Sequence, residues 1–146
     1  NYGPWQYQEK LIPLTIKNAM NNTIIPLYGN GLNIRDWLFV DDHINALLKV
    51  ALNGKIGDQY CIGGNCELTN RYVVEKICDT IDLHLNRSRP SKELIKLVKD
   101  RPGHDYRYSI NSNKLNKELG WKPLYDFHQG LDITIKWYIN YYFDKK

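Results

Sequence analysis

The stretch Gly29-Asn30-Gly31-Leu32-Asn33-Ile34-Arg35-Asp36-Trp37 joins two apolar runs, Ile24 to Tyr28 and Trp37 to Val40, that are rich in β-forming residues. Its two glycines can adopt backbone angles closed to other residues, so the chain can turn sharply there. Arg35 follows the turn, between the aromatic residues Tyr28 and Trp37. A guanidinium group suits a phosphate or carboxylate, and a flat ring suits a base or sugar face. The stretch therefore predicts a turn between two strands that carries an anion site.

A strand–helix–strand order follows this turn. Trp37 to Val40 is expected to be a strand, Asp41 an N-cap, Asp42 to Leu52 a helix and Gln59 to Ile62 a further strand. The helix should turn one apolar face inward, made of Ile44, Leu47, Leu48 and Ala51. This order is typical of a parallel sheet.

Helices and short strands alternate over the rest of the chain. Helices are expected over residues 9–22, from a Thr69 cap to Leu85, from a Ser112 cap to Gly120, and from Asp126 onward. Strands are expected over residues 94–98 and 106–110. The fold class is therefore α/β, and the length of 146 residues allows one domain.

The composition limits the classes of function. A hydrophobic fraction of 42% and a charged fraction of 25% are ordinary for a soluble globular domain. The net charge of +4 suits a phosphorylated small ligand as well as nucleic acid, but no basic tail indicates nucleic acid. No apolar run approaches the roughly 20 residues of a membrane span, and no signal peptide is recognisable. Because the chain starts without methionine and within a motif, we expect a fragment.

Known cofactor motifs are incomplete. Gly29-x-Gly31 lacks the third small residue of a dinucleotide fingerprint, since position 34 is isoleucine, so a nicotinamide site would lie outside this chain. Cys61, Cys66 and His43 lack a second ligand pair at zinc-finger spacing, and we expect no metal site. The three cysteines, Cys61, Cys66 and Cys78, are an odd number without paired spacing, which indicates reduced cytosolic thiols and not a disulfide framework.

Several groups could bind an anion. Lys10, Arg35, Arg101 and His104 carry or can carry positive charge, and Asn70 begins a helix whose backbone N–H groups favour negative charge. The alternative for each is a solvated surface group, which is the commoner fate of a lone charged residue.

Eight motifs occur in a fixed order along the chain and together resemble a known family. They are Asn1-Tyr2-Gly3-Pro4, Glu9-Lys10-Leu11-Ile12-Pro13, Asn33-Ile34-Arg35-Asp36-Trp37, Asp41-Asp42-His43, Tyr60-Cys61-Ile62-Gly63-Gly64, Asp100-Arg101-Pro102-Gly103-His104-Asp105, Glu118-Leu119-Gly120-Trp121 and Trp137-Tyr138. This order resembles the carboxyl-terminal half of the dTDP-glucose 4,6-dehydratases, which are extended short-chain dehydrogenases/reductases. The Arg-Pro-Gly-His-Asp run distinguishes that family from epimerases and decarboxylases of the same fold. Gln8 and His128 depart from the family pattern, outside the ligand motifs.

The resemblance implies an activity, a cofactor and a set of ligand residues. The family converts dTDP-glucose to the 4-keto-6-deoxy sugar nucleotide with tightly bound NAD, and its catalytic and cofactor residues lie in the amino-terminal half. By motif, the residues expected at the substrate are Lys10 and Leu11 beside the deoxyribose and phosphate, Pro26 and Tyr28 on the thymine, Arg35, Asn70, Arg101 and His104 on the diphosphate, and Asn1 near the sugar end. No catalytic residue is expected in this chain.

The resemblance also implies an architecture. The chain should be the substrate-binding part of the fold, with residues 37–62 partly belonging to the Rossmann sheet of the missing half. The complete protein is expected to be a cytoplasmic homodimer that binds a dTDP-sugar and neither nucleic acid nor membrane. A UDP-glucose 4,6-dehydratase, a UDP-sugar decarboxylase and a non-catalytic nucleotide-diphosphate-binding module are the alternatives.

Overall fold

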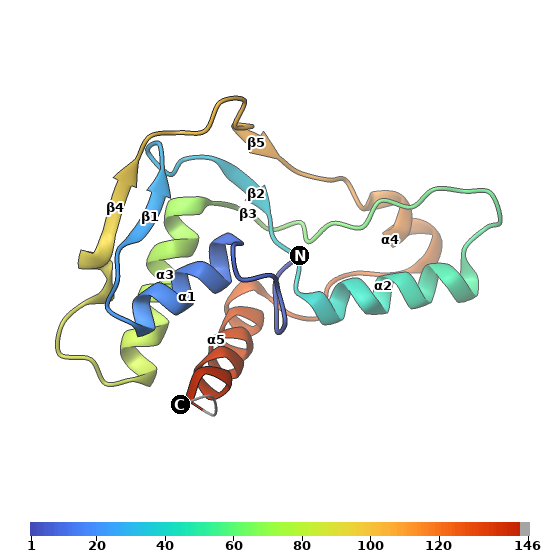
Figure 1. Cartoon of the computed structure of the whole chain (residues 1–146). Helices are drawn as coiled ribbons and strands as arrows, with labels where there is room; N and C mark the ends of the chain where they lie inside the picture. Colours follow the sequence, from blue (N-terminus) through green and yellow to red (C-terminus); the bar gives the residue numbers. More distant parts are fainter. Residues whose placement is uncertain (144–146) are drawn as a thin grey trace.

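The strands form two small sheets in the computed structural model, which describes residues 1–143 (Figure 1). In the first sheet, β1 (Ile25–Tyr28) pairs in parallel with β4 (Ile95–Val98). In the second, β2 (Ile34–Asp36) lies between β3 (Glu67–Thr69), which is antiparallel to it, and β5 (Arg107–Tyr108), which is parallel. The α/β class expected from the sequence is confirmed.

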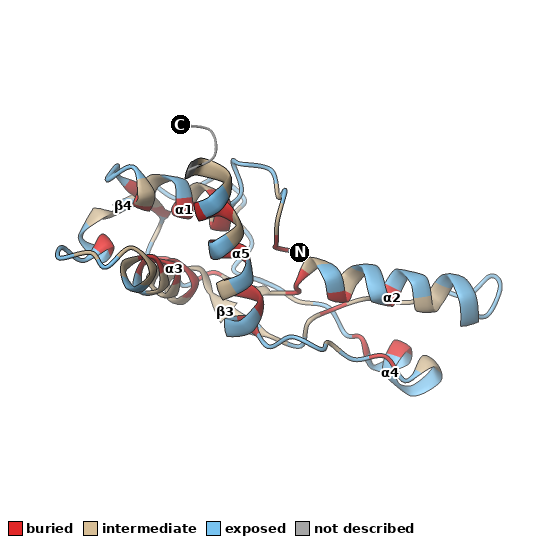
Figure 2. Ribbon diagram, turned by 90° about the horizontal axis from the view of Figure 1, so that it is seen from below, coloured by how far each residue is buried: buried red, intermediate tan, exposed pale blue. Residues whose placement is uncertain are grey.

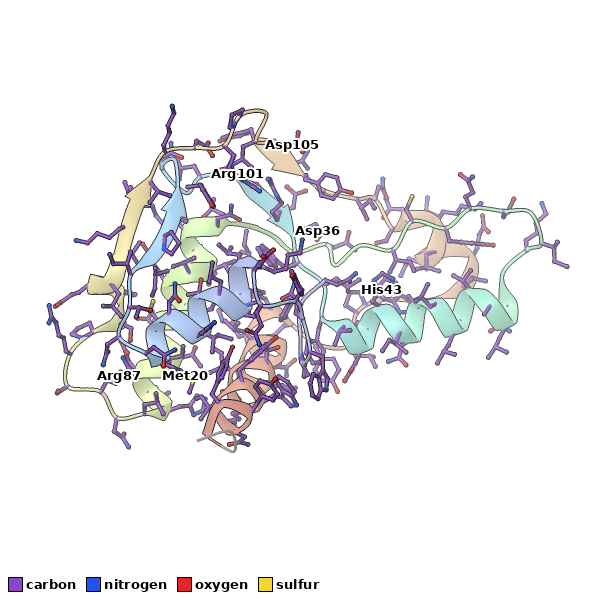
Figure 3. The ribbon with its side chains drawn as sticks, in the orientation of Figure 1. Met20, Asp36, His43, Arg87, Arg101 and Asp105 are labelled. Atoms are coloured by element: carbon purple, nitrogen blue, oxygen red, sulfur yellow. The ribbon has the colours of Figure 1, made fainter. Side chains whose placement is uncertain are left out.

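Three helices enclose the main core beside these sheets: α1 (Leu11–Met20), α3 (Asn70–His84) and α5 (Phe127–Phe143). The inward face predicted for α3 is confirmed, because Val73, Val74, Ile77, Cys78 and Ile81 are all buried. Thr69 caps this helix as expected, its side chain accepting a hydrogen bond from the Tyr72 amide. At the other end of the helix, Arg87 donates to the Met20 carbonyl and so ties α3 to the end of α1 (Figure 3). A single 3-10 turn, η1 (Ser91–Leu94), then leads into β4.

An arm extends from this part and contains α2 (Val40–Asn53) and α4 (Asn113–Leu119) (Figure 1). Its own core is small, consisting of Leu38, Ala46, Leu115 and Trp121. Most of α2 is exposed (Figure 2), and the face predicted to be inward is about half exposed at Ile44, Leu47 and Leu48. That prediction is wrong for the described residues, because nothing among residues 1–143 covers this face of the helix.

Two predicted strands are also absent from the arm. Phe39 makes only an isolated parallel bridge with Tyr2, and no strand forms over residues 59–62. A strand requires a neighbour to accept and donate its backbone hydrogen bonds, and the described residues provide none here. No helix of the described residues is long and apolar enough to cross a membrane.

The first turn of α2 corrects the cap assigned to Asp41. The helix begins two residues earlier than predicted, at Val40, with Phe39 in the cap position. The next carboxylate, Asp42, is completely buried and accepts from the amides of Leu124 (2.9 Å) and Tyr125 (3.2 Å). Asp42 therefore attaches the base of the arm to the segment that leads into α5.

The helix-end signals predicted at Asp126 and Gly120 are confirmed, whereas the capping bond predicted for Ser112 does not form. Asp126 and Gln129 each bond to the other's backbone amide, so Asp126 opens α5 as predicted. Gly120 ends α4 in the left-handed conformation expected of a C-cap glycine. Ser112 occupies the cap position of α4 but makes no capping bond, and the Asn111 side chain accepts from the Asn113 amide instead.

Replacing Asp42 by alanine should destabilise the protein by about 2–4 kcal/mol, because two backbone amides lose a charged acceptor in a dry site. Asp41→Ala is the matched control. Its carboxylate is exposed, and the change should alter the free energy of unfolding by less than about 0.5 kcal/mol. Urea unfolding of both variants measures this, and equal losses would contradict the assignment.

Candidate functional site

The carboxyl ends of β1 and β4 lie side by side and define one edge of the molecule. Tyr28 is in register with Val98, and the Gly29 amide donates to the Val98 carbonyl at 2.9 Å. The loop that follows β4 consequently passes next to the loop that follows β1. Arg101 lies over the Tyr28 ring, 5.2 Å from its centroid, and the His104 ring meets it edge-on at 6.5 Å. The structure thus brings together three of the predicted site residues.

Tyr28 is an exposed residue of this edge. Its side chain is 40% exposed, whereas Ile25 and Leu27 on the other face of β1 are buried. Pro26 is half-buried on the same face as Tyr28, because residues two apart on a strand point the same way. The pair therefore offers a flat apolar surface at the strand end.

Asp100 holds the loop in shape. Its Oδ1 accepts from His104 Nδ1 at 2.6 Å and from the Arg101 amide at 2.8 Å, and these bonds lower the pKa of Asp100. The His104 side chain is only 5% exposed. Since Nδ1 donates to the carboxylate, Nε2 is the ring atom left for a ligand. The sequence motif contains Asp100, but only the geometry assigns it this positioning role.

Arg35 reaches the same loop from β2. Its guanidinium donates from Nη1 to the Ile34 carbonyl at 2.7 Å and from Nη2 to the Asp105 carbonyl at 2.9 Å. The Asn33 side chain donates to the same carbonyl of Asp105 at 3.2 Å. Figure 3 places Asp105 and Arg101 on this loop, next to β2. Arg35 thus fastens the loop to β2, and three of its five N–H groups remain available to an anion.

The start of α3 is differently arranged from what the sequence suggests. The amides of Asn70 and Arg71 donate to the carbonyls of Asn33 and Gly31, each at 2.9 Å. The Tyr72 amide donates to its cap, Thr69. Because these amides already have acceptors, the expectation that they bind an anion is wrong.

The first turn of α1 lies across a cavity from Tyr28 and Arg101. The cavity has a volume of about 830 Å³, and its walls are formed by Trp5, Gln6, Tyr7, Gln8, Glu9, Leu14, Lys17, Tyr28, Arg101, Trp137, Tyr138 and Tyr141. Lys10, exposed, is the N-cap of α1, and Leu11, half-buried, is its first residue; both lie in the sequence between the lining residues Glu9 and Leu14. They are at the margin of this cavity and not in its wall.

Asn1 lies apart from this group, at the root of the arm (Figure 1). Its side-chain Oδ1 is 2.7 Å from Nδ1 of His43, in the first turn of α2. Tyr2 forms an isolated bridge with Phe39, so Asn1 lies near the segment that follows β2. The sequence analysis considered His43 as a metal ligand and as part of the Asp41-Asp42-His43 motif, but predicted no contact with Asn1.

No metal cluster is recognisable among the described residues, and the Gly29–Gly31 turn does not have the geometry of a dinucleotide-binding loop. No group of three or more potential metal ligands occurs among them. The Gly29–Gly31 turn enters a strand and not a helix, and a side chain at Gly31 would collide with Leu27 and Arg71. This turn therefore cannot act as the pyrophosphate loop of a bound NAD, which requires a helix start beside open space.

Sequence and structure comparisons identify the class. The profile of the GDP-mannose 4,6-dehydratase family matches residues 1–134, and the chain belongs to this family. Structural neighbours with lower identity have the same extended short-chain dehydrogenase/reductase fold. One is a UDP-glucose 4-epimerase from Thermotoga maritima, at 19% identity over 97% of this chain with a TM-score of 0.83.

Within this class, the chain is similar to dTDP-glucose 4,6-dehydratases. It is 50% identical over 144 residues to the enzyme from Haemophilus influenzae, and the match covers 95% of this chain and 42% of the relative. The crystal structure of the Bacillus anthracis enzyme in complex with NAD has a TM-score of 0.85 at 48% identity, over 96% of this chain and 42% of the other. The Streptomyces venezuelae enzyme with NAD and TYD bound gives 0.88 at 40% identity, over 96% and 41%. The chain thus spans about two fifths of the length of these relatives.

Gly29→Ala should destabilise the protein more than Gly103→Ala. Both glycines have positive φ (57° and 66°), so each alanine costs about 1–2 kcal/mol in backbone strain. Only at Gly29 would the new methyl group meet the Asp100 carboxylate, at 2.9 Å, whereas the space around Gly103 is open. Thermal unfolding of the two variants tests this. Equal decreases in the melting temperature would contradict a steric conflict between the Asp100 carboxylate and a side chain at position 29.

Proposed function

We propose that this chain is the carboxyl-terminal, nucleotide-sugar-binding half of a dTDP-glucose 4,6-dehydratase, which converts dTDP-glucose to dTDP-4-keto-6-deoxyglucose with bound NAD. The main support is the edge formed by β1 and β4. There an exposed tyrosine lies beneath an arginine and a histidine, in a chain 50% identical to such an enzyme. A diphosphate carries about two negative charges at neutral pH, and charge-assisted donors bind it more strongly than neutral ones.

The nucleotide would bind along this edge. Tyr28 and Pro26 would pack on the thymine, and Lys10 and Leu11 would lie along the deoxyribose and phosphate. Arg35, Arg101, His104 and the Asn70 side chain would hold the diphosphate, with Asn1 toward the sugar. Arg101 now covers one face of the Tyr28 ring. On binding, its guanidinium would move from the ring to the phosphates while the base takes its place.

NAD would be held by the part of the enzyme that this chain does not match, since the described residues do not fit its pyrophosphate. When bound, NAD supplies the hydride transfer on which the dehydration depends. The exposed apolar face of α2 and the unpaired segment 59–62 support a contact with that part. Residues 37–62 would there complete the Rossmann sheet, which would cover the face and supply the missing backbone partners.

The isolated chain should have no dehydratase activity, because it lacks a site for the hydride carrier. Incubating it with dTDP-glucose and NAD⁺ and assaying for the alkali-absorbing 4-keto product tests this expectation. The complete enzyme, assayed in parallel, is the positive control. Turnover by the isolated chain above a protein-free blank would contradict the proposal that NAD is bound by the part of the enzyme that this chain does not match.

Arg35→Lys should weaken dTDP binding by roughly ten- to a hundredfold in the complete enzyme. A lysine offers one compact ammonium group in place of the planar fork, and a hydrogen bond to a charged group contributes about 1.5–3 kcal/mol. Calorimetric titration with dTDP measures the loss, and titration with UDP and GDP tests the base preference. Arg35→Ala should lose more affinity and also some thermal stability, because it releases the Asp105 carbonyl.

Arg89→Lys is a matched control for this substitution. Arg89 precedes β4 at its amino end and pairs with Glu93, whereas the proposed site is at the carboxyl end of β4. Its replacement should leave the affinity for dTDP unchanged. If Arg35→Lys behaved like Arg89→Lys, Arg35 would have only the structural role of holding the loop.

A further inference from the structure

We infer that Arg101 makes the site select nucleoside diphosphates over nucleosides, because its guanidinium competes with the nucleobase for the Tyr28 ring until a diphosphate binds the guanidinium. The inference rests on the proposed function, in which Tyr28 packs on the thymine and Arg101 binds the diphosphate. It adds a thermodynamic coupling between the two parts of the nucleotide. Binding of the diphosphate should strengthen binding of the base, and by reciprocity binding of the base should strengthen binding of the diphosphate.

The guanidinium of Arg101 has the Tyr28 ring as its contact and is otherwise uncommitted. Its central carbon lies over the ring, 5.2 Å from the centroid. Within residues 1–143 the guanidinium makes no hydrogen bond or ion pair, and only the backbone amide of Arg101 bonds to Asp100. All N–H donors of this exposed side chain are therefore available to a charged acceptor.

The covered face of Tyr28 is also a surface on which a base can stack. Tyr28 and Arg101 both line the cavity of about 830 Å³ beside the start of α1, and the Tyr28 side chain is 40% exposed. The His104 ring meets the Tyr28 ring edge-on, so it leaves the faces of that ring to other groups. A guanidinium and a nucleobase are both flat groups that bind the face of an aromatic ring. The two groups therefore compete for the face that Arg101 covers.

The loop allows Arg101 to change its partner without a change of the backbone. Asp100 accepts from the Arg101 amide at 2.8 Å and from His104 Nδ1 at 2.6 Å. The Asp105 carbonyl accepts from Arg35 at 2.9 Å, which fastens the other end of the loop to β2. Figure 3 shows Arg101 on this loop, close to Asp105. Only the side-chain torsions of Arg101 have to change when its guanidinium leaves the ring.

The strengths of the two contacts determine the size of the coupling. The apparent affinity for the base is reduced in proportion to the fraction of molecules whose ring is uncovered. A cation–π contact at an exposed site is weak and corresponds to a reduction of roughly two- to fivefold. Hydrogen bonds from a guanidinium to phosphate oxygens are stronger than such a contact. A diphosphate thus removes the competing group, whereas a nucleoside has to displace it without that help.

The test uses two ligands in the complete enzyme: thymidine, measured by ligand-observed NMR, and dTDP, measured by calorimetric titration. Arg101→Ala should weaken dTDP binding by roughly ten- to a hundredfold, because a charge-assisted hydrogen bond is lost. The same change should strengthen thymidine binding by roughly two- to fivefold, because it uncovers the ring. Saturating inorganic pyrophosphate should strengthen thymidine binding to the wild-type enzyme by a similar factor and should have no effect on thymidine binding to the variant.

Lys99→Ala is the matched control for the loss of one positive charge. Lys99 is exposed, precedes Arg101 by two residues, and makes no hydrogen bond or ion pair within the described part of the chain. Its replacement should change neither affinity by more than about twofold. The melting temperature of Arg101→Ala should equal that of the wild-type enzyme, because the side chain that it removes is exposed and makes no hydrogen bond there.

The outcomes separate the inference from the proposed function. Unchanged or weaker thymidine binding in Arg101→Ala would overturn the competition for the Tyr28 ring and leave the proposed function standing. So would a pyrophosphate effect that is absent from the wild-type enzyme or that persists in the variant. If the wild-type enzyme bound neither ligand, or if neither Tyr28→Ala nor Arg101→Ala weakened dTDP binding, the proposed function would fail and the inference with it.

Discussion

The parallel pairing of β1 with β4 is the constraint on which the rest of the site depends. Two parallel strands end at the same edge, so the segment after Tyr28 and the segment after Val98 must leave the sheet together. The hydrogen bond from the Gly29 amide to the Val98 carbonyl extends the pairing by one residue past β1. The positive φ of Gly29 then turns the chain away and leaves room for Asp100. Without that pairing, Tyr28 and Arg101, which are separated by seventy-odd residues in sequence, would have no reason to meet.

A second set of bonds joins this edge to the other sheet. The Asp105 carbonyl accepts from both Asn33 and Arg35, and the amide of Ile34 donates to the Tyr106 carbonyl. The loop after β4 is thus held from β4 on one side and from β2 on the other. Such a loop can present Arg101 and His104 with little loss of conformational freedom on binding, which is how preorganised sites gain affinity.

The helices of this chain could be predicted from local signals, because those signals are sufficient on their own. Thr69 and Gly120 mark real ends, and the spacing of Val73, Val74, Ile77 and Ile81 identifies the buried face of α3. The arm could not be predicted in the same way. The pattern around Ile44 and Leu47 is that of a buried helix face, but burial requires a partner, and the described residues contain none. Local rules also fail to distinguish the adjacent carboxylates Asp41 and Asp42. Asp42 is the structural one because it accepts a hydrogen bond from the Leu124 amide, 82 residues away in the sequence.

The contrast between local signals and long-range contacts also applies to the candidate site. Motif resemblance selected Tyr28, Arg101 and His104, and the structure brings them together. The helix start at Asn70 looked equally suitable by a local rule, but long-range carbonyls from Gly31 and Asn33 use its amides. Asp100 contacts His104, and His43 contacts Asn1, and residue type alone does not predict either contact.

The position of the two ends of the site suggests how the missing part of the enzyme would influence it. The edge that carries Tyr28, Arg101 and His104 lies beside the main core of α1, α3 and α5, which is formed by residues of this chain. Asn1 and His43 are in contact at the root of the arm, where the core of the described residues consists of four buried side chains. An arm that is weakly held by itself would be ordered when its apolar face is covered, since burying three half-exposed aliphatic side chains contributes several kcal/mol at ~25 cal/mol per Å². In the proposed enzyme, docking of the NAD-binding part on this face would therefore order the root of the arm, where Asn1 and His43 are in contact.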